Sequence, residues 1–272
     1  MTSTLKVAAI QMVSATSVQA NLDAARGLLE EAARAGAELA ALPEYFCLMG
    51  KRDDDKLAVR EAFGDGAVQR FLSDTARELK MWIVGGTLPL AAADDAHVRN
   101  TCIVFKPDGE RAARYDKIHL FRFDNGREQY DESRVIERGG DPVAFELVAR
   151  DGHAWRFGMS VCYDLRFPEL YRALAADVLL VPSAFTHVTG QAHWELLLRA
   201  RAVENLAYVV APAQGGLHEN GRRTWGHSMV VGPWGVVLDQ LAEGAGVVMA
   251  ELDSARLAQV RAQLPALEHR VL

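Results

Sequence analysis

The stretch Met-Ser-Val-Cys-Tyr-Asp-Leu-Arg-Phe-Pro-Glu, residues 159–169, determines how the rest of this chain is interpreted. The apolar run that leads into it ends abruptly at Cys162, and a polar turn follows before Pro168 and Glu169. Proline is favoured in the first turn of a helix, so the pattern predicts a buried strand, a sharp turn and a helix start. A thiol at such a corner lies at the edge of a sheet, where a small molecule can reach it. We therefore take Cys162 as a candidate nucleophile.

The segments around this stretch alternate between two periodicities. Apolar runs of strand length recur along the chain, and amphipathic helical patterns separate several of them. We predict strands at residues 5–12, 38–43, 82–87, 100–106, 111–115, 143–148, 155–161, 178–181, 208–212, 228–231, 236–238 and 247–252. We predict helices at residues 21–35, 68–79, 169–175, 194–203 and 254–264. Helices between strands early in the chain, and hairpins later, indicate a mixed sheet system in an α/β chain.

Some local signals sharpen these boundaries. Gly36 follows the first helix as a C-cap glycine does, and Ser254 is a plausible N-cap for the last. Pro-Asp-Gly at 107–109 is a strong turn signal and predicts a hairpin. Residues 118–140 are irregular and polar, and a connection of this length in a compact domain is usually functional.

Composition limits the classes of protein to which this chain can belong. It has 272 residues, of which 50% are hydrophobic and 24% are charged, with a net charge of −6. This suits one domain over residues 1–272 and argues against a nucleic-acid partner. The N-terminus lacks the pattern of a signal peptide, and no apolar run approaches ~18 residues, so we expect no membrane span. Three widely spaced cysteines disfavour a disulfide framework and favour a cytoplasmic protein.

Two further residues share the placement of Cys162. Glu44 and Lys117 also fall at or just past the end of a predicted strand, which is the edge where α/β sheets bind ligands. A thiol with a pKa of ~8.5 is mostly protonated at neutral pH. A carboxylate can accept its proton, while an ammonium favours the thiolate and stabilises an oxyanion. The backbone N–H of Tyr163 is a candidate second oxyanion donor.

Each of these residues also has a plainer interpretation. A cysteine at a strand end is more often a small buried hydrophobe, and a lone Glu or Lys at such a position is usually solvated. His119 lies two residues from Lys117 and could serve as the base in a rival Cys-His scheme, or it could be a structural hydrogen-bonding residue. No His-x3-His or Cys-x2-Cys spacing occurs, so we expect no metal and no other cofactor.

Three motifs resemble the signature regions of the nitrilase, or carbon–nitrogen hydrolase, superfamily. They are Leu-Pro-Glu at 42–44, Tyr-Asp-Lys-Ile-His-Leu at 115–120 and the stretch from Cys162 to Glu169. The resemblance implies a four-layer α-β-β-α sandwich and a Glu-Lys-Cys triad. By it, Glu44 is the general base, Lys117 the oxyanion-stabilising cation and Cys162 the nucleophile. The family's second glutamate, which contacts the lysine, matches Glu132; considered alone, that residue is a solvated loop position.

The C-terminal half resembles the Nit amidase branch of this superfamily. The segments that carry this resemblance are residues 182–186, 189–195, 199–205 and 226–235, and the likeness extends from about residue 6 to residue 270. It implies an amidase that hydrolyses the terminal amide of a small carboxylate-bearing substrate through a thioester and releases ammonia. Deaminated glutathione is the first choice of substrate. The alternatives are an ω-amidase acting on α-ketoglutaramate, another small-amide hydrolase, and a non-catalytic binding relative.

Both named substrates carry carboxylates, so we expect a cation in the pocket. Arg166, four residues past Cys162, is the candidate because guanidinium pairs bidentately with carboxylate; an internal ion pair with Asp164 or Glu169 is the equal alternative. Phe185, Thr186 and Tyr45 complete the candidate substrate-binding residues, although core packing is the plainer role for Phe185. The family resemblance also implies a homodimer or higher homo-oligomer.

Overall fold

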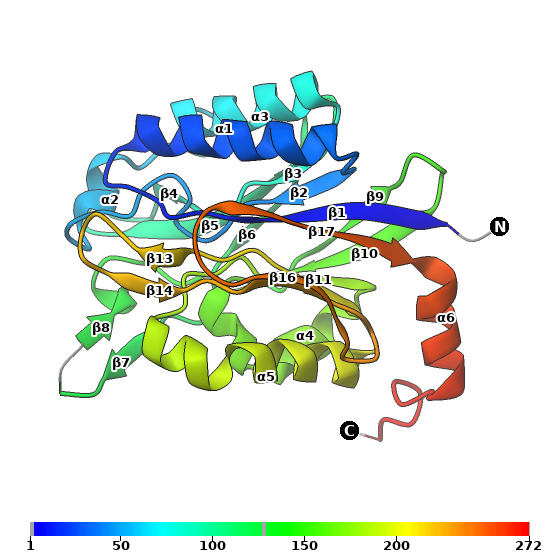
Figure 1. The fold of residues 1–272 in the computed structure, drawn as a ribbon. Coiled ribbons are helices and arrows are strands. Elements are labelled where there is room, and N and C mark those ends of the chain that lie inside the picture. Colours follow the sequence, from blue (N-terminus) through cyan, green and yellow to red (C-terminus); the bar gives the residue numbers. More distant parts are fainter. Residues whose placement is uncertain (1–2, 127–128, 272) are drawn as a thin grey trace.

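Two β-sheets packed face to face form the centre of the molecule in the computed structural model, which describes residues 3–126 and 129–271 (Figure 1). Within these ranges one sheet has the strand order β17-β1-β2-β3-β5-β4, with β6 also paired to β5, and the other has the order β16-β15-β12-β11-β10-β9. The strands of the first sheet are β1 (Thr4–Gln11), β2 (Leu39–Ala41), β3 (Trp82–Val84), β4 (Leu88–Ala91), β5 (Val98–Phe105), β6 (Arg111–Asp116) and β17 (Gly246–Asp253). Those of the second are β9 (Ala144–Val148), β10 (Ala154–Met159), β11 (Val178–Leu180), β12 (Tyr208–Ala211), β15 (Ser228–Val231) and β16 (Val237–Leu241).

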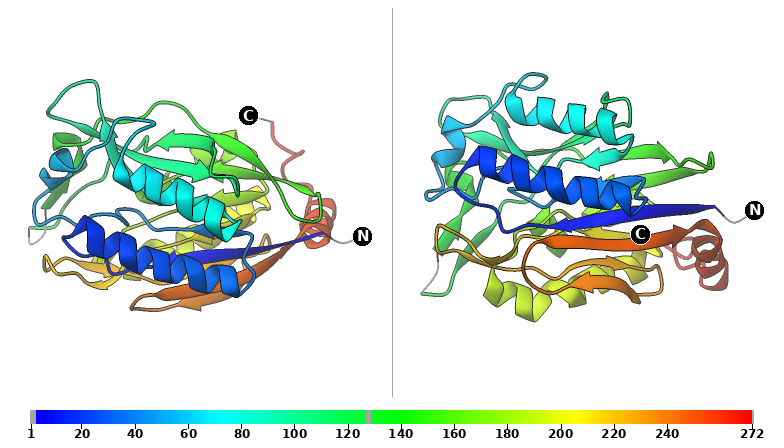
Figure 2. Two further views of the ribbon diagram at one scale, coloured as in Figure 1. Left: turned by 90° about the horizontal axis from the view of Figure 1, so that it is seen from above. Right: turned by 45° about the horizontal axis from the view of Figure 1, so that its top comes forward.

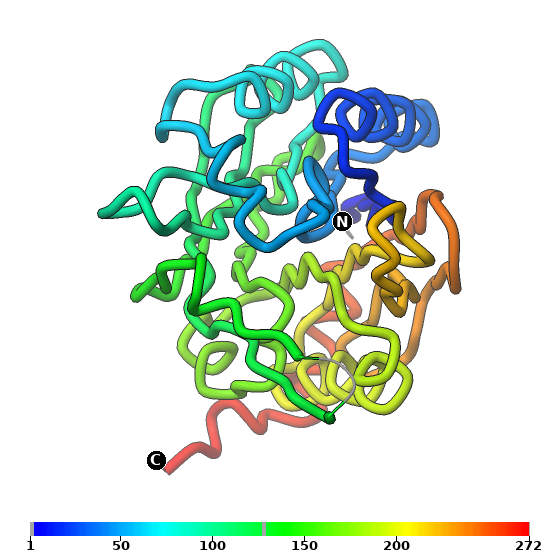
Figure 3. Tube along the Cα trace, turned by 90° about the vertical axis from the view of Figure 1, so that its left-hand side faces the viewer, coloured from blue at the N-terminus to red at the C-terminus, as the bar shows by residue number. Residues whose placement is uncertain are grey.

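Helices cover the outer face of each sheet. Helices α1 (Val18–Arg34) and α3 (Ala67–Leu79) lie side by side over the first sheet (Figure 2). Helices α4 (Pro168–Leu174) and α5 (His187–Asn205) cover the second, and in the end-on view of Figure 3 the yellow-green coil of α5 lies opposite the blue and cyan coils of α1 and α3. The last helix, α6 (Ser254–Gln263), packs at one end of the sandwich. The predicted four-layer α-β-β-α arrangement is confirmed.

The side chains of β1 show why this order of layers forms. Val7 and Ala9 point into the core between the two sheets, and Ala8 and Ile10 point into the core under the helices. Successive side chains of a strand face opposite sides, so a strand buried on both faces must be apolar throughout. This is why the strand appears in the sequence as a continuous apolar run.

Two helix starts differ from the sequence-based prediction by more than one residue, and one N-cap differs. Helix α1 begins at Val18 instead of residue 21, with Ser17 as its N-cap. Helix α5 begins at His187 instead of residue 194, because the hydroxyl of Thr186 accepts a hydrogen bond from the Thr189 N–H and caps the helix. The added turns carry Gly190, where a side chain would collide with Trp225, so the glycine serves close packing rather than breaking the helix. Helix α6 is capped by Asp253 rather than by Ser254.

The irregular segment at 118–140 contains regular structure that was not predicted. Its described part folds into the short hairpin of β7 (Arg122–Asp124) and β8 (Gln129–Asp131), followed by the 3₁₀ helix η1 (Glu132–Arg134); residues 127 and 128 lie outside the described part. A second unpredicted hairpin joins β13 (Gly215–Leu217) and β14 (Arg223–Trp225). These strands have three residues each and, unlike the equally short β2, β3 and β11, are not apolar runs, which explains why both hairpins were missed.

Candidate active site

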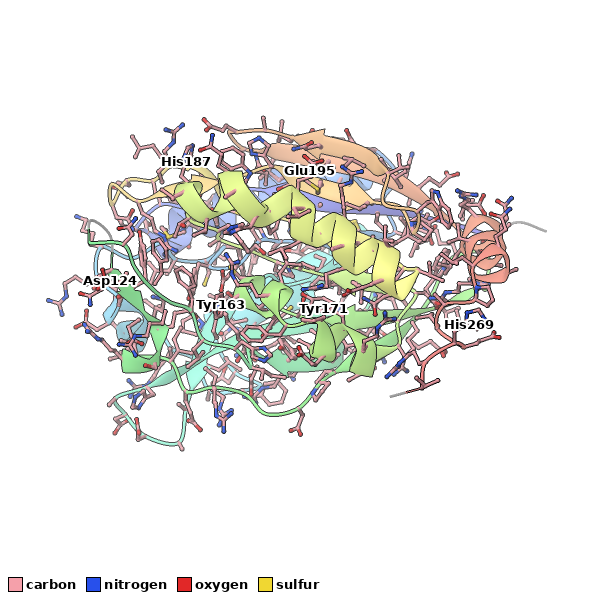
Figure 4. All side chains as sticks on the ribbon, turned by 90° about the horizontal axis from the view of Figure 1, so that it is seen from below. Asp124, Tyr163, Tyr171, His187, Glu195 and His269 are labelled. Atoms are coloured by element: carbon pink, nitrogen blue, oxygen red, sulfur yellow. The ribbon has the colours of Figure 1, made fainter. Side chains whose placement is uncertain are left out.

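Three chain segments bring the predicted triad residues to one end of the sandwich. Glu44 lies in the turn after β2, and Lys117 is the residue directly after β6. Cys162 follows β10 and begins the 3₁₀ helix η2 (Cys162–Arg166), which leads into α4. Seen from below, the segment with the labelled Tyr163 and Tyr171 lies beside α5 (Figure 4). The strand-to-turn-to-helix path predicted from residues 159–169 is therefore present, with a 3₁₀ turn at the corner.

Glu44 is held rigidly, and its carboxylate is buried. Oε1 accepts hydrogen bonds from Asn100 Nδ2 at 2.9 Å and from Lys117 Nζ at 2.9 Å. Oε2 accepts a hydrogen bond from the backbone N–H of Ala184 at 3.0 Å. Three donors fix the plane of this carboxylate, as a group that must exchange a proton with a neighbour requires.

Lys117 lies between two carboxylates. Nζ donates to Glu44 Oε1 at 2.9 Å and to Glu132 Oε1 and Oε2 at 2.9 and 2.8 Å. Burial would lower the pKa of Lys117, but the charges of Glu132 and Glu44 outweigh it and raise this pKa above its ordinary value. The residue is therefore a permanent cation, and its hydrogen-bonding capacity is already occupied by the two carboxylates.

Glu132 comes from η1, inside the segment that carried no periodic pattern. Besides Lys117, its carboxylate accepts hydrogen bonds from Tyr45 Oη at 2.7 Å and from the Phe121 N–H at 2.7 Å. Burial would raise the pKa of Glu132, but the adjacent ammonium of Lys117 lowers it below its ordinary value. The structure thus places Glu132 against Lys117 and not in solvent.

Cys162 occupies a strained backbone conformation. Its φ of 51° lies in the left-handed region, which costs a non-glycine residue roughly 1–2 kcal/mol. The Cys162 N–H donates to the Pro182 carbonyl at 3.0 Å and is therefore committed to the scaffold. The N–H of Tyr163 lies in the first turn of η2, where backbone donors have no partner within the helix. Non-glycine residues at positive φ concentrate at functional sites, where the surrounding structure compensates for the strain.

The thiol of Cys162 is protonated at rest. Burial and the negative charge of Glu44 raise its pKa well above the ordinary value, and the opposing charge of Lys117 does not offset them. A nucleophile of this kind needs a base that removes the proton during attack. Glu44 shares the cavity with Cys162 and is the carboxylate available for this step.

Asp164, for which we predicted no role in positioning the site, organises the corner. It is fully buried, and Oδ2 accepts from the Val161 N–H at 2.8 Å and from Tyr115 Oη at 2.6 Å. Oδ1 accepts from the His119 N–H at 3.0 Å and lies 2.7 Å from His119 Nδ1. One carboxylate thus joins the nucleophile turn to residues on both sides of Lys117.

The ring of His119 stacks on Phe167 with centroids 3.7 Å apart and does not line the cavity, which supports the structural role over the Cys-His scheme.

A cavity of about 300 Å³ opens over Cys162. Four of the residues predicted to contact substrate or oxyanion line it, namely Tyr163, Arg166, Phe185 and Thr186. The other lining residues in the described part are Glu44, Phe121, Glu132, Ala184, Thr189 and Arg222. Tyr45, predicted to bind substrate, does not line this cavity; it stands on the far side of Glu132, whose carboxylate it orients.

Arg166 faces the cavity, and no acid of the described residues forms an ion pair with it. Its guanidinium lies 5.7 Å from the ring centroids of both Tyr163 and Phe185, and Nη2 lies 3.3 Å from His193 Nδ1. Neither Asp164 nor Glu169 pairs with it among the interactions of the described residues. The geometry favours the pocket-cation hypothesis over the internal ion pair.

Sequence reasoning missed three polar residues of this site. Asn100 donates to Glu44, while Arg222 and Lys56 place basic groups on the cavity and on the hollow next to it. Asn100 lies inside a predicted strand, and Arg222 and Lys56 lie in segments with no pattern. Nothing in their local sequence distinguishes them from surface polar residues.

Two other kinds of feature are absent from the described residues. Within residues 3–126 and 129–271, no group of three or more His, Cys, Asp or Glu side chains is placed to hold a metal ion. In the same ranges, no helix combines the length and the apolar character needed to cross a membrane.

Comparison with known proteins identifies the family. The model of the carbon-nitrogen hydrolase family matches residues 6–262. A protein of Synechocystis sp. named deaminated glutathione amidase is 43% identical to this chain, and the match covers 97% of each chain. The Homo sapiens protein of the same name is 39% identical, and the match covers 97% of this chain and 81% of the human chain. The crystal structure of Saccharomyces cerevisiae Nit3, described as a member of branch 10 of the nitrilase superfamily, has a TM-score of 0.86 with 31% identity and covers 99% of this chain and 97% of that one.

The resemblance carried by three short motifs thus extends over almost the whole chain and its fold, and the prediction of a Nit-type hydrolase is confirmed. This chain belongs to the carbon–nitrogen hydrolase family and is an enzyme that hydrolyses amides.

Proposed function

We propose that this enzyme hydrolyses deaminated glutathione through a thioester on Cys162. The observation that carries the proposal is the 43% identity, over 97% of both chains, to a protein named for that activity. The cavity supports it, because a thiol, a buried carboxylate and the guanidinium of Arg166 line one space of about 300 Å³. The alternative is α-ketoglutaramate, which presents the same 2-oxo diacid acyl group with a smaller leaving group.

The chemistry of the substrate changes one expectation. Deaminated glutathione has only secondary amides, so its hydrolysis releases an amine and not ammonia. Ammonia is the product of the α-ketoglutaramate alternative alone. Because both substrates share the acyl group, we assign the scissile bond to the amide between that group and cysteine. The products are then 2-oxoglutarate and the dipeptide of cysteine and glycine.

The first half of the reaction uses all three triad residues. Cys162 Sγ attacks the amide carbonyl carbon while its proton passes to Glu44. The charge of Lys117 and the Tyr163 N–H stabilise the oxyanion. One N–H of Lys117 can turn from Glu132 to the oxyanion, because Glu132 keeps the hydrogen bonds from Tyr45 and Phe121.

The second half regenerates the thiol. Glu44 gives its proton to the departing amine nitrogen as the C–N bond breaks, which leaves a thioester on Cys162. Glu44 then takes a proton from water, the hydroxide attacks the thioester carbonyl, and the thiolate leaves and recovers the proton from Glu44. Arg166, Phe185 and Thr186 hold the acyl group through both halves, so they contribute to binding more than to proton transfer.

We also propose a cytoplasmic homodimer. All three cysteines are free and buried, which suits a reducing compartment. Large apolar side chains are exposed on α5 and on the turn and strand beside it, where a second subunit would cover them. They are Val188, Leu196, Val203, Trp234, Val236 and Leu238.

The test is to incubate the enzyme with deaminated glutathione and with α-ketoglutaramate in parallel and to quantify 2-oxoglutarate from each. We expect a higher kcat/KM for deaminated glutathione, and we expect the Cys162→Ala variant to be inactive on both. A clear preference for α-ketoglutaramate would overturn the substrate assignment. Near-native activity of Cys162→Ala would overturn the mechanism. Sedimentation or light scattering at micromolar concentration tests the dimer.

A further inference from the structure

Two basic side chains that the proposed mechanism does not use line the cavities on either side of Glu132. The cavity over Cys162 adjoins a second one of about 370 Å³, and the two share Phe121, Glu132 and Arg222 as walls. Lys56 and Arg222 both line this second cavity and the wider hollow of about 560 Å³ that follows it. The two cations therefore line a row of adjoining cavities that begins at the thiol.

Lys56 is an ammonium group with little compensation for its burial. Only 14% of its side chain is exposed, and Nζ lies 4.9 Å from the centroid of the Tyr45 ring. Among the described residues, Lys56 Nζ donates a hydrogen bond to the backbone carbonyl of Asp53 at 3.3 Å. Its ion-pair partner is the Asp53 carboxylate, whose Oδ1 is 3.9 Å away and whose side chain is 71% exposed. Burial lowers the pKa of Lys56. A charge held in this way gains from a carboxylate ligand.

Arg222 precedes β14 and lies between the two cavities. Nη2 donates a long hydrogen bond of 3.4 Å to the Ala184 carbonyl, and the guanidinium lies 5.2 Å from the centroid of the Tyr130 ring. Its Nε is buried and has no hydrogen-bond partner in the described structure. Buried polar groups of this kind normally have a partner, so the unused donor points to a ligand.

Two of the acids on the same walls are held by other partners. Glu132 is engaged by Lys117, Tyr45 and the Phe121 N–H. Asp131, which also lines the second cavity, accepts hydrogen bonds from Ser133. In the second cavity Asp53, Asp131 and Glu132 thus face Lys56 and Arg222. In the wider hollow Asp53 is the single acid among the described lining residues and faces Lys51, Arg52, Lys56 and Arg222, so positive charge prevails at that outer end.

We propose that Lys56 and Arg222 form a second carboxylate subsite, which binds the leaving-group end of the substrate. The inference rests on the proposed function and specifies its substrate class: an amide whose amine portion ends in a carboxylate. In deaminated glutathione that carboxylate belongs to glycine, the second residue of the leaving group. In an extended chain it lies at most roughly 7 Å from the scissile nitrogen. The wider hollow suits this end of the substrate, because the leaving group must depart before water attacks the thioester.

The experiment changes one group on each side of the contact. Wild type, Lys56→Met and Arg222→Met are assayed with deaminated glutathione and with its analogue in which the glycine carboxylate is a carboxamide. Released 2-oxoglutarate is measured by chromatography. Methionine keeps the stem that packs on Tyr45, and thermal melting verifies that each variant is folded. Lys106→Met is the matched control, since it removes a lysine charge that pairs with Glu110, four residues away.

Wild type is expected to prefer the acid over the carboxamide by ~10- to 100-fold in kcat/KM, the range for a hydrogen bond between charged groups. Lys56→Met and Arg222→Met should each reduce this preference, through KM, while Lys106→Met keeps it. If wild type does not discriminate, or if both variants discriminate as wild type does, the subsite does not exist. If wild type cleaves α-ketoglutaramate but neither peptide substrate, the proposed function fails and the subsite fails with it.

Discussion

Replacing Asp164 with asparagine tests whether one buried carboxylate holds the nucleophile in place. The substitution keeps the size and shape of the side chain and exchanges one acceptor oxygen for an NH₂ donor. Asp164 serves four donor positions: the Val161 N–H and Tyr115 Oη at one oxygen, and the N–H and Nδ1 of His119 at the other. Asparagine cannot serve all four.

The cost follows from these contacts. In either orientation of the new amide, the backbone N–H of Val161 or of His119 faces an NH₂ group and loses its acceptor, which costs about 1–3 kcal/mol. The bonds that remain go to a neutral acceptor instead of a charged one and lose about 1 kcal/mol in total. The sum is about 3 kcal/mol, which corresponds to a decrease of roughly 6–12 °C in Tm for a chain of this size.

Urea unfolding followed by fluorescence measures the change, and differential scanning calorimetry gives Tm. Asp239→Asn is the matched control, because Asp239 accepts from the Met249 N–H at 3.0 Å at an exposed site, and we expect a change within about 0.5 kcal/mol. We also expect a lower kcat for Asp164→Asn, since the turn that sets the position of Cys162 loosens. Stability within 0.5 kcal/mol of wild type would refute the argument that this carboxylate holds the corner.

Three further predictions concern ionisable groups. Burial opposes ionisation of Glu132, but Lys117 lowers the pKa of this carboxyl below the ordinary 4.5. The ionised Glu132 therefore stabilises the folded protein above pH 4.5, and this contribution is lost as pH falls through the folded-state pKa. The gap in unfolding free energy between wild type and Glu132→Gln should therefore narrow below pH 4.5 in urea titrations, and a widening gap would contradict this assignment. Burial is the largest cause of the raised pKa of the Cys162 thiol, and the charge of Glu44 is the second. In the Glu44→Gln variant, iodoacetamide should therefore alkylate Cys162 faster at neutral pH, while amide hydrolysis falls by ~10²- to 10⁴-fold. Slower alkylation would mean that Glu44 promotes the thiolate at rest. Burial raises the pKa of Cys47 to about 12, so mass spectrometry after brief alkylation at neutral pH should find Cys47 unmodified in the native protein and modified in urea.

The layers of the fold were predictable from the sequence because buried strands and amphipathic helices have distinct periodicities. Val7 to Ile10, for example, form a run with no polar residue, and both faces of that strand are buried. The helix start at His187 was not predictable in this way. It depends on the cap formed by Thr186 and on the contact between Gly190 and Trp225, and the second of these exists only in the folded chain.

The residues of the site also differ in how far the sequence could predict them. Glu44, Lys117 and Cys162 were candidates because each follows a strand end, and the family resemblance gave them their roles. The structure brings Glu44 and Lys117 into direct contact. Glu132 depended on the family resemblance, since its own segment carries no pattern. Arg222 reaches the cavity from the loop before β14, and Lys56 reaches the adjoining cavity from the four-residue helix α2 (Asp55–Ala58); the conformation of both segments depends on tertiary contacts. Their roles, like those of the triad, stay predictions until the variants are assayed.

The pairing of β1 with β17 has a consequence for synthesis on the ribosome. The two strands are antiparallel along all of β1, from Thr4 opposite Asp253 to Gln11 opposite Gly246 (Figure 1). About 240 residues separate them, which at ~5–20 residues per second takes on the order of 10–50 s to translate. Throughout that interval one edge of β1 has no partner.

An unpaired edge on a strand that is apolar on both faces is a site for aggregation or chaperone binding. The nascent chain must therefore be protected, or must remain loosely packed, until β17 emerges. The first sheet, which carries Glu44 and Lys117, is completed only when the last strand of the chain has been synthesised.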